Sequence, residues 1–511
     1  MEKNRHVLKE IIKVLLLCAR QNVAIRGHTE ERSNFIVILK LKSENDPILR
    51  EHLSAGKDRA TYLSPQIQNE LIDLCARQIR DTLVTACNSA GCFGFIADEA
   101  KDCSTSEQIS LCVRFYDRST GEVKEYFLGF VEADSTTGEA LAETFLNTLE
   151  EYGINVNNIR GQGYDGAANM AGKHRGVQAR IRQRIPYANY THCRAHSLNL
   201  AIVHACKEPL IRNLMDTVQT IAFAFDYSAK RLLQFKESLE LDRDVKDAMD
   251  RKTKIKTLCE TRWFSRVDSL TTFLKCYDVI VAALEELSED GDSKARSHVC
   301  SILQFDFIVA LVTAEHVLAP TNPLSALLQA KEQDLLEAVK ECQAVISILQ
   351  AERADDTVWE AIFSKCEEVG TTHNIAASVP RVVGRQQHRY DIPASDNQEF
   401  KREIQRWKAR WADVVDKPAT LADSLRAIRT PELYPNVYHI LEILLSMPVS
   451  SASAERSFSI MRRLKTYLRS TMTGDRLSSL AVLHSYRETD IDLDKIIEKF
   501  AAKKPRRLVL Q

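Results

Sequence analysis

The sequence lacks the features that mark a membrane or a secreted protein. Its longest apolar run near the start, IIKVLLLCA, is interrupted by Lys13 and is far shorter than the roughly 20 residues of a membrane span. No signal-peptide layout with a cleavage site is present. The 13 cysteines are scattered and odd in number. We therefore expect no membrane partner, and reduced thiols in the cytosol or nucleus.

The chain also lacks a net charge of either sign. Its 69 Lys and Arg residues and 70 Asp and Glu residues leave a formal charge of −1, so any attraction to nucleic acid must come from a local patch. One segment stands out because it has no acid at all, from Gly166 to Lys207. Its basic side chains and histidines are Lys173, His174, Arg175, Arg180, Arg182, Arg184, His192, Arg194, His196, His204 and Lys207.

The hydrophobic periodicity predicts a mixed α/β protein with large all-α parts. Residues 1–90 show helical spacing, with Ser64 and Pro65 as a candidate helix start. Between residues 91 and 133 the period changes, and three apolar runs follow one another as two hairpins. The middle run, QISLCVRFYD, alternates and predicts a half-buried strand. A helix over 137–152 then follows, so the sheet is expected to be mixed rather than doubly wound.

The stretch GQGYDG at 161–166 fits the G-x-G-x-x-G fingerprint of dinucleotide binding. That fingerprint needs an acid about 20 residues later for the ribose, and here the following segment has none. Asp165 would also stand where a pyrophosphate sits. We therefore predict no nucleotide cofactor. A carboxylate beside a basic stretch suits metal-assisted chemistry on a polyanion instead, unless Asp165 is only a turn residue and the basic run a solvated face.

Two further acids lie in comparable settings. Asp98 ends the apolar run FGFIAD, and Glu455 lies in the early turns of a helix predicted from SSASAERSFSIMRRL. Ser451 or Ser453 is the candidate N-cap of that helix. Each acid also has a plain interpretation: Asp98 as an ordinary strand-ending residue, and Glu455 as an acid favoured by the helix dipole.

Five segments stand in the order FIADEAKD, GQGYDGAANM, THCRAHSLNLA, TRW and SSASAERSFSIMRRLKTYLR. Together they resemble the hAT superfamily of DNA transposases and the host proteins derived from them. Within that superfamily they look most like the branch that contains the repressor of the inhibitor of the protein kinase and the MYM-type zinc-finger proteins. The resemblance implies an RNase H-like core interrupted by a helical insertion. It also implies that Asp98, Asp165 and Glu455 are the catalytic and metal-binding acids.

That resemblance further implies a reaction and a domain plan. The reaction is nicking at a transposon end, hairpin formation on flanking DNA and strand transfer, with Mg²⁺ (or Mn²⁺) as the cofactor. The expected parts are an N-terminal helical region, the first part of the core, the helical insertion, the last part of the core with a C-terminal dimerisation region, and a basic tail. Their bounds are 1–90, 91–210, 211–430, 431–490 and 491–511.

The resemblance assigns DNA contacts to several residues. Trp263, next to Arg262, matches the tryptophan that can stack on a flipped base, although a core Trp is an equally good interpretation. Cys193 and His196 match a C-x-x-H element and are expected to pack and contact DNA ends. A zinc site is not expected, because no second ligand pair stands out. Arg175 and Arg194 complete the predicted DNA-binding set.

The C-terminal region is expected to form a homodimer or a higher homo-oligomer. The apolar side chains predicted for this contact are Phe458, Leu464, Leu468, Leu477, Leu480 and Leu483. Some of them must also pack on the chain's own core. The KKPRR cluster at 503–507 is compatible with nuclear import, so the expected location is the nucleus.

One departure from the family pattern leaves the function open. No zinc-binding DNA-recognition module is evident in the first 60 residues, where Cys18 is the only cysteine. A transposase-type enzyme core, a domesticated and non-catalytic dimerising regulator or scaffold, and a helical adaptor without a nucleic-acid role all remain open. The acid-free basic segment argues against the adaptor.

Overall fold

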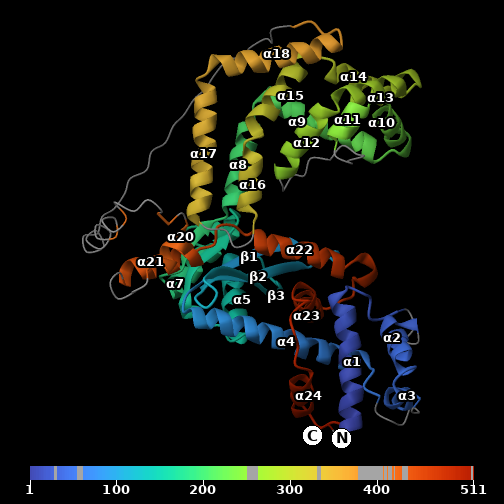
Figure 1. The fold of residues 1–511 in the computed structure, drawn as a ribbon, viewed down its shortest axis with the longest axis vertical. Coiled ribbons are helices and arrows are strands. Elements are labelled where there is room, and N and C mark those ends of the chain that lie inside the picture. The colour runs from blue at the N-terminus through green and yellow to red at the C-terminus, as the bar shows by residue number, and fades with distance from the viewer. Residues whose placement is uncertain are drawn as a thin grey trace. The chain divides into compact units, whose positions relative to one another are not determined.

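The computed structural model divides the chain into two compact units (Figure 1). One unit comprises 1–193, 331–335 and 402–511, and the other comprises 194–330 and 336–401. The residues that the structure describes are 1–27, 32–54, 61–249, 263–330, 335–377, 407, 411, 417–418, 420–428, 435–507 and 510, without the side chains of 248, 263–266, 435–436 and 468.

The first unit is built on a five-stranded mixed sheet of order β3-β2-β1-β4-β5. Strands β1, β2 and β3 pair antiparallel, while β4 runs parallel to β1 and β5 parallel to β4. This arrangement confirms the predicted mixed sheet. The strands are β1 (Phe93–Lys101), β2 (Glu107–Asp117), β3 (Glu122–Glu132), β4 (Ile159–Tyr164) and β5 (Asn189–His192).

The strand predicted for QISLCVRFYD is present as β2, but the predicted half-burial is wrong. Strand β2 is buried at every position between its two end residues, because helices cover both of its faces. Figure 1 shows α4 (Pro65–Ala90) and α22 (Ala452–Leu464) on opposite sides of the strands. The guanidinium of Arg114 is therefore fully buried. It forms an ion pair with Glu125 at 2.7 Å and donates to the Leu445 carbonyl at 3.1 Å.

Helices before and after the sheet complete the first unit. As predicted, α4 begins at Pro65, and the Ser64 side chain accepts a hydrogen bond from the Ile67 amide at 3.5 Å. The other helices of this unit are α1 (Glu2–Arg20), α2 (Asn34–Ser43), α3 (Pro47–Leu53), α5 (Gly138–Glu151), α6 (Ala168–Ala171), α7 (Val177–Arg184), α20 (Leu421–Arg426), α21 (Pro435–Ser446), α23 (Gly474–Ser485) and α24 (Leu493–Ala502).

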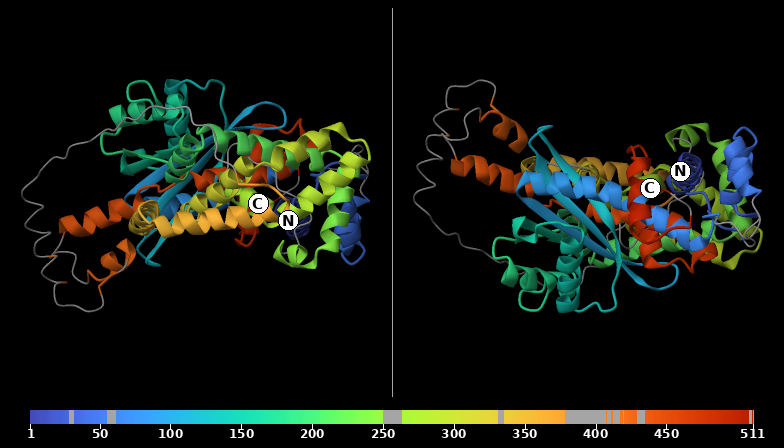
Figure 2. Two further views of the ribbon diagram at one scale, coloured as in Figure 1. Left: turned by 90° about the horizontal axis from the view of Figure 1, so that it is seen from above. Right: turned by 90° about the horizontal axis from the view of Figure 1, so that it is seen from below.

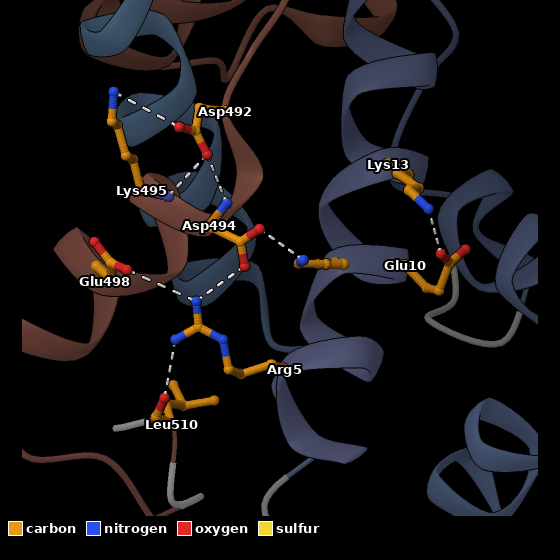
Figure 3. A network of polar contacts seen from close by, with 9 residues as sticks. Arg5, Glu10, Lys13, Asp492, Asp494, Lys495, Glu498 and Leu510 are labelled. Carbon is orange, nitrogen blue, oxygen red and sulfur yellow. Dashed lines mark hydrogen bonds and ion pairs between the residues drawn. The ribbon is translucent and has the colours of Figure 1, made fainter. Parts of the chain in front are cut away.

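The two ends of the chain lie side by side in the first unit (Figure 2). Helix α1 packs beside α24, and Figure 3 shows the polar contacts between them. Arg5 Nη2 and Lys9 Nζ reach the two carboxylate oxygens of Asp494, at 2.9 Å and 2.8 Å. Arg5 Nη1 also donates to the Leu510 carbonyl at 3.2 Å. The N-terminal helices are thus an integral part of the unit that holds the sheet.

The apolar side chains predicted for dimerisation lie in this same core. Five of them are at most 5% exposed and pack against the chain's own helices and strands, namely Phe458, Leu464, Leu477, Leu480 and Leu483. In this structure they are therefore not available to a partner. The side chain of Leu468 lies outside the described residues.

The second unit is helical, and its described part contains no strand. Its core includes Phe225, Phe235, Phe273 and Leu284, all at most 2% exposed. The helices are α8 (Arg194–Ala205), α9 (Pro209–Asp226), α10 (Ala229–Leu241), α11 (Arg243–Ala248), α12 (Trp263–Lys275), α13 (Tyr277–Glu289), α14 (Ser293–Ile302), α15 (Phe305–Leu318), α16 (Thr321–Leu328), α17 (Leu335–Arg353) and α18 (Asp356–Thr372).

Among the described residues, no single helix is long and apolar enough to cross a membrane. One pair, α14 and α15, reaches the required length and composition only when the two are taken together, and it is bent by 70° at its junction.

A buried ion pair joins the end of β1 to the end of α22. Lys465 Nζ lies 2.7 Å from Asp102 Oδ2, and the two side chains are 4% and 0% exposed. The Gln108 amide and the Ser104 main-chain amide also donate to Asp102, at 3.2 Å and 2.7 Å. Burial alone would raise the pKa of Asp102, but these hydrogen bonds and the Lys465 charge hold it below its ordinary value.

Replacing Asp102 by Asn should destabilise the first unit by about 3–5 kcal/mol, because the buried Lys465 ammonium loses its countercharge. Denaturant unfolding at pH 7 measures this, with the exposed Asp134→Asn as the control. Since the folded pKa of Asp102 lies below the unfolded value, its contribution is present above the unfolded pKa and is lost as pH falls through the folded pKa. Equal stabilities of Asp102→Asn and the control would contradict the prediction.

Candidate active site

Asp98 and Asp165 follow neighbouring parallel strands. The register of β1 and β4 pairs Phe95 with Gln162 and Ile96 with Gly163. Continued by two residues, this register brings Asp165 beside Asp98 at the same end of the sheet. Sites are commonly built at this end of parallel strands. The Tyr190 hydroxyl, from β5, donates to the Asp165 carbonyl at 3.0 Å and supports the turn after β4.

The third acid arrives on a helix from far along the chain. Glu455 lies in the first turn of α22. Two residues later, Ser457 donates a hydrogen bond from its hydroxyl to that of Ser110 at 2.7 Å. Ser110 is the β2 residue that pairs directly with Asp98. This contact therefore fixes the Glu455 turn over the part of the sheet that carries Asp98.

The glycines of GQGYDG have a packing role that explains their spacing. A Cβ on Gly161 would lie 2.8 Å from Pro448 Cδ, and a Cβ on Gly163 would lie 2.5 Å from Pro448 Cβ. In the neighbouring strand β1, a Cβ on Gly94 would lie 2.1 Å from the Ser446 carbonyl oxygen. The glycines thus let the segment before α22 lie directly against β1 and β4.

Cys193 takes part in holding Glu455. Its amide donates to the Tyr164 carbonyl at 2.9 Å, and its sulfur lies 3.3 Å from both the amide and the hydroxyl of Ser451. The Ser451 hydroxyl lies 2.9 Å from Glu455 Oε1. Ser451 is the N-cap residue of α22, but its side chain makes no capping bond. Contacts therefore run from the C-x-x-H element to the predicted acid.

The charges of Glu455 and Asp165 both act on Asp98. Burial raises the pKa of Asp98 well above its ordinary value, and the charges of Glu455 and then Asp165 raise it further. A fourth acid, Glu99, has its pKa raised to about 7 by burial and by the charges of Glu107 and Asp165. Asn169 donates to Glu99 at 3.3 Å. This end of the sheet therefore concentrates negative charge in a partly dry setting.

The chemistry of these acids fits a divalent cation, because carboxylate oxygens are the ligands that Mg²⁺ and Mn²⁺ prefer. The positions of these acids fit a metal ion less well than their chemistry does. Within the described part of the chain, no three His, Cys, Asp or Glu side chains are placed to hold a single metal ion. The three acids are thus close enough to shift the pKa of Asp98 but do not form a closed ligand set.

A basic hollow lies beside Asp165 in the first unit. It has a volume of 670 Å³ and is lined by Lys173, Gln178, Arg182, Gln183, Asn189 and Tyr190, together with two alanines. No acid lines it. Neither Lys173 nor Arg182 forms an ion pair with a described acid. Burial, with the charge of Asp165, raises the pKa of Tyr190 to about 12.

The other predicted DNA-binding residues are scattered. Arg175 is exposed in the loop before α7, in the first unit. Arg194 and His196 lie on α8, in the second unit. Arg262 and the side chain of Trp263 lie outside the described residues.

The sequence predicts the three acids but not the residues that contact and position their segments. Ser110, Ser457 and Pro448 have no chemical signature of their own. The one usable signal was the pair of glycines two residues apart in a short strand, which indicates a close backbone approach.

Two domain models match separate parts of the chain and identify hAT-derived domains in it. Residues 1–176 match the family model of the ZMYM1/FAM200 RNase-like domain, and residues 428–488 match the hAT family C-terminal dimerisation region. The second match supports a homo-oligomer. Among known proteins, the chain is homologous to the human 52 kDa repressor of the inhibitor of the protein kinase. The two are 23% identical over 594 residues, covering 98% of this chain and 76% of the human protein. The mouse protein of the same name is also 23% identical, over 591 residues, with 98% and 77% covered.

Replacing Gly161 by Ala should destabilise the first unit by about 1–3 kcal/mol, because the new methyl group overpacks against Pro448. Combining it with Pro448→Ala, which removes the clashing Cδ, should recover part of that loss. Denaturant unfolding of the two single variants and the double variant gives the coupling energy. Strictly additive effects would show that the two residues do not meet.

Replacing Asp98 by Asn should stabilise the metal-free protein at pH 7 by about 0.5–2 kcal/mol, as is common when an unfavourable functional group is removed. A carboxyl whose pKa is raised by folding favours the folded state below its unfolded pKa, and this contribution is lost as pH rises through the folded pKa. Thermal unfolding in EDTA measures the effect, with the exposed Glu143→Gln as the control. A lower melting temperature for Asp98→Asn would refute it.

Proposed function

We propose that this chain is a hAT-type protein that cleaves and transfers DNA strands in a metal-dependent reaction. The observation that carries the proposal is the electrostatic contact of Asp98 with both Glu455 and Asp165. These acids come from three separate segments of the chain and are half-buried, and a group of like-charged carboxylates in such a setting is costly unless it serves a purpose.

In the proposed reaction, Asp98, Asp165 and Glu455 bind Mg²⁺ or Mn²⁺. When bound, divalent ions supply positive charge at the attacking and leaving oxygens of a phosphodiester. Ser451 and Ser457 hold the Glu455 turn against the sheet. The basic hollow that includes Lys173 and Arg182 receives the DNA backbone through phosphate contacts, which position DNA without reading its sequence.

The test compares Mn²⁺ binding in the presence of a short DNA hairpin for wild type, Asp98→Asn and Asp165→Asn. Wild type should bind Mn²⁺ and nick a supercoiled plasmid, and both variants should lose binding and nicking. Asp134→Asn, which changes an exposed carboxyl outside the site, serves as the matched control. Equal Mn²⁺ binding by all four proteins would rule out an acid-based metal site.

A second candidate function is that of a dimerising, non-catalytic regulator or scaffold. It is favoured by the names of the two relatives, which describe a repressor of a protein-kinase inhibitor. The absence of a closed set of three metal ligands among the described side chains points the same way. A protein that binds DNA with steep salt dependence but neither binds Mn²⁺ nor nicks DNA would have this function.

Either function places the chain in the nucleus, and we propose that location. The basic cluster at 503–507 is engaged in part, because the guanidinium of Arg506 forms an ion pair with Glu70 and stacks on the Phe500 ring at 3.5 Å. Lys503, Lys504 and Arg507 remain exposed.

A further inference from the structure

Three arginines of the first unit, one from near the start of the chain and two from near its end, meet near the start of α23. Arg26 lies in the loop after α1, Arg469 lies in the short helix η4 (Tyr467–Arg469), and Arg476 lies in the first turn of α23. Arg26 Nη2 donates to Asn69 Oδ1 at 2.7 Å, and Arg476 Nη1 donates to the same oxygen. We call these three residues the arginine cluster.

Neutral groups hold the arginine cluster in place. Besides Asn69, Arg26 donates to Gln68 Oε1 at 3.3 Å and to the Pro65 carbonyl at 2.8 Å. Arg469 donates to the side-chain and main-chain oxygens of Asn22, at 2.8 Å and 3.2 Å. All of these acceptors are amide oxygens, so none offsets the positive charge.

No described carboxylate pairs with any member of the arginine cluster. Burial lowers the pKa of Arg26 and Arg469, although part of Arg26 stays exposed. Burial lowers the pKa of Arg476 to about 10, and the charges of Arg26 and Arg469 contribute to that decrease. The three positive charges repel one another, and a bound anion would relieve this repulsion.

The cluster has donors left for a ligand. A guanidinium carries five N–H groups, and Arg476 uses one of them within the described structure. Arg476 also stands at a helix N-terminus, where positive charge is disfavoured and an anion is favoured. The N-cap residue of that helix, Thr473, makes no side-chain capping bond. Asp475, in the same turn, is exposed and forms no ion pair with a described residue.

Two contacts place η4 at the end of the sheet that carries the candidate active site. The Ser104 hydroxyl donates to the Ser470 carbonyl at 3.2 Å, and Lys465 pairs with Asp102. Both Asp102 and Ser104 belong to the turn directly after β1, the strand that holds Asp98. A polyanion that reaches Asp98 therefore passes the end of the sheet to which η4 is attached.

We propose that Arg26, Arg469 and Arg476 form a second phosphate-binding site, which takes backbone phosphates of DNA away from the three acids. The proposal rests on the proposed function for its DNA. Arginine forks match phosphate oxygens in charge and geometry, and this cluster, with Arg26 exposed and Arg469 and Arg476 half-buried, has no acidic partner among the described residues. The site supplies affinity and orientation rather than base recognition.

The first experiment tests the phosphate site without DNA, on the full chain in EDTA. Tripolyphosphate should raise the melting temperature of wild type, and it should raise that of the double variant Arg26→Gln/Arg469→Gln much less. Lys495→Gln/Lys499→Gln removes the same charge from exposed lysines of α24 and should behave as wild type. Arg26→Gln alone, at the most exposed of the three positions, is tested in parallel in case the double variant fails to fold.

The second experiment measures DNA affinity as a function of salt. Each phosphate contact contributes about 0.9 to the slope of log K against log salt. The arginine double variant should therefore lose about 1–2 units of slope, while the lysine control keeps the wild-type slope. Wild-type nicking is scored separately, because it tests the three acids rather than the arginine cluster.

The outcomes separate the two proposals. Loss of both tripolyphosphate stabilisation and salt slope in the arginine variants supports the site. No stabilisation of wild type overturns it, even if wild type nicks DNA. Stabilisation with an unchanged slope, or with no DNA binding at all, overturns the assignment to DNA and leaves a site for free phosphate compounds.

Discussion

The first unit depends on the close approach of one returning segment to the face of the sheet. After the helical unit, the chain returns to the first unit. Its segment at Pro448 lies against glycines of β1 and β4, because a Cβ atom at those positions would clash with it. From that point α22 follows the sheet, fixed at its start by Ser457 on Ser110 and at its end by Lys465 on Asp102. These contacts determine where Glu455 lies. Its own side chain adds only the contact with Ser451.

The sequence allowed the mixed sheet to be predicted, because a change from helical to alternating periodicity is a local signal. Asp98 could be singled out for a similar reason, since it ends an apolar run, whereas Asp165 and Glu455 were predicted from a glycine-rich motif and a helix start, and from the resemblance to the family. Burial on both faces of β2 could not be predicted, because Arg114 and Ser110 are polar residues whose partners, Glu125 and Ser457, come from other segments. The arginine cluster could not be predicted either, since Arg26 is separated by hundreds of residues from Arg469 and Arg476.

The region that matches the hAT dimerisation model also forms part of the core of the first unit. Its family match covers α21 to α23, and in the structure the apolar side chains of α22 and α23 complete the core of the first unit. A contact with a second copy must therefore use side chains on the outer faces of these helices, where Arg462, Arg463 and Tyr467 are exposed. Dimerisation and integrity of the candidate active site thus share the same helices.

The seating of Pro448 on the sheet also has a consequence for folding during synthesis. All five strands are synthesised by residue 192. The segment that covers their glycine-lined face is made only after the helical unit is complete. At typical synthesis rates of about 5–20 residues per second, the interval is on the order of tens of seconds. Throughout that time the face around Gly161 and Gly163 is uncovered, so the nascent chain offers a defined apolar surface to chaperones until about the last eighth of the chain is made.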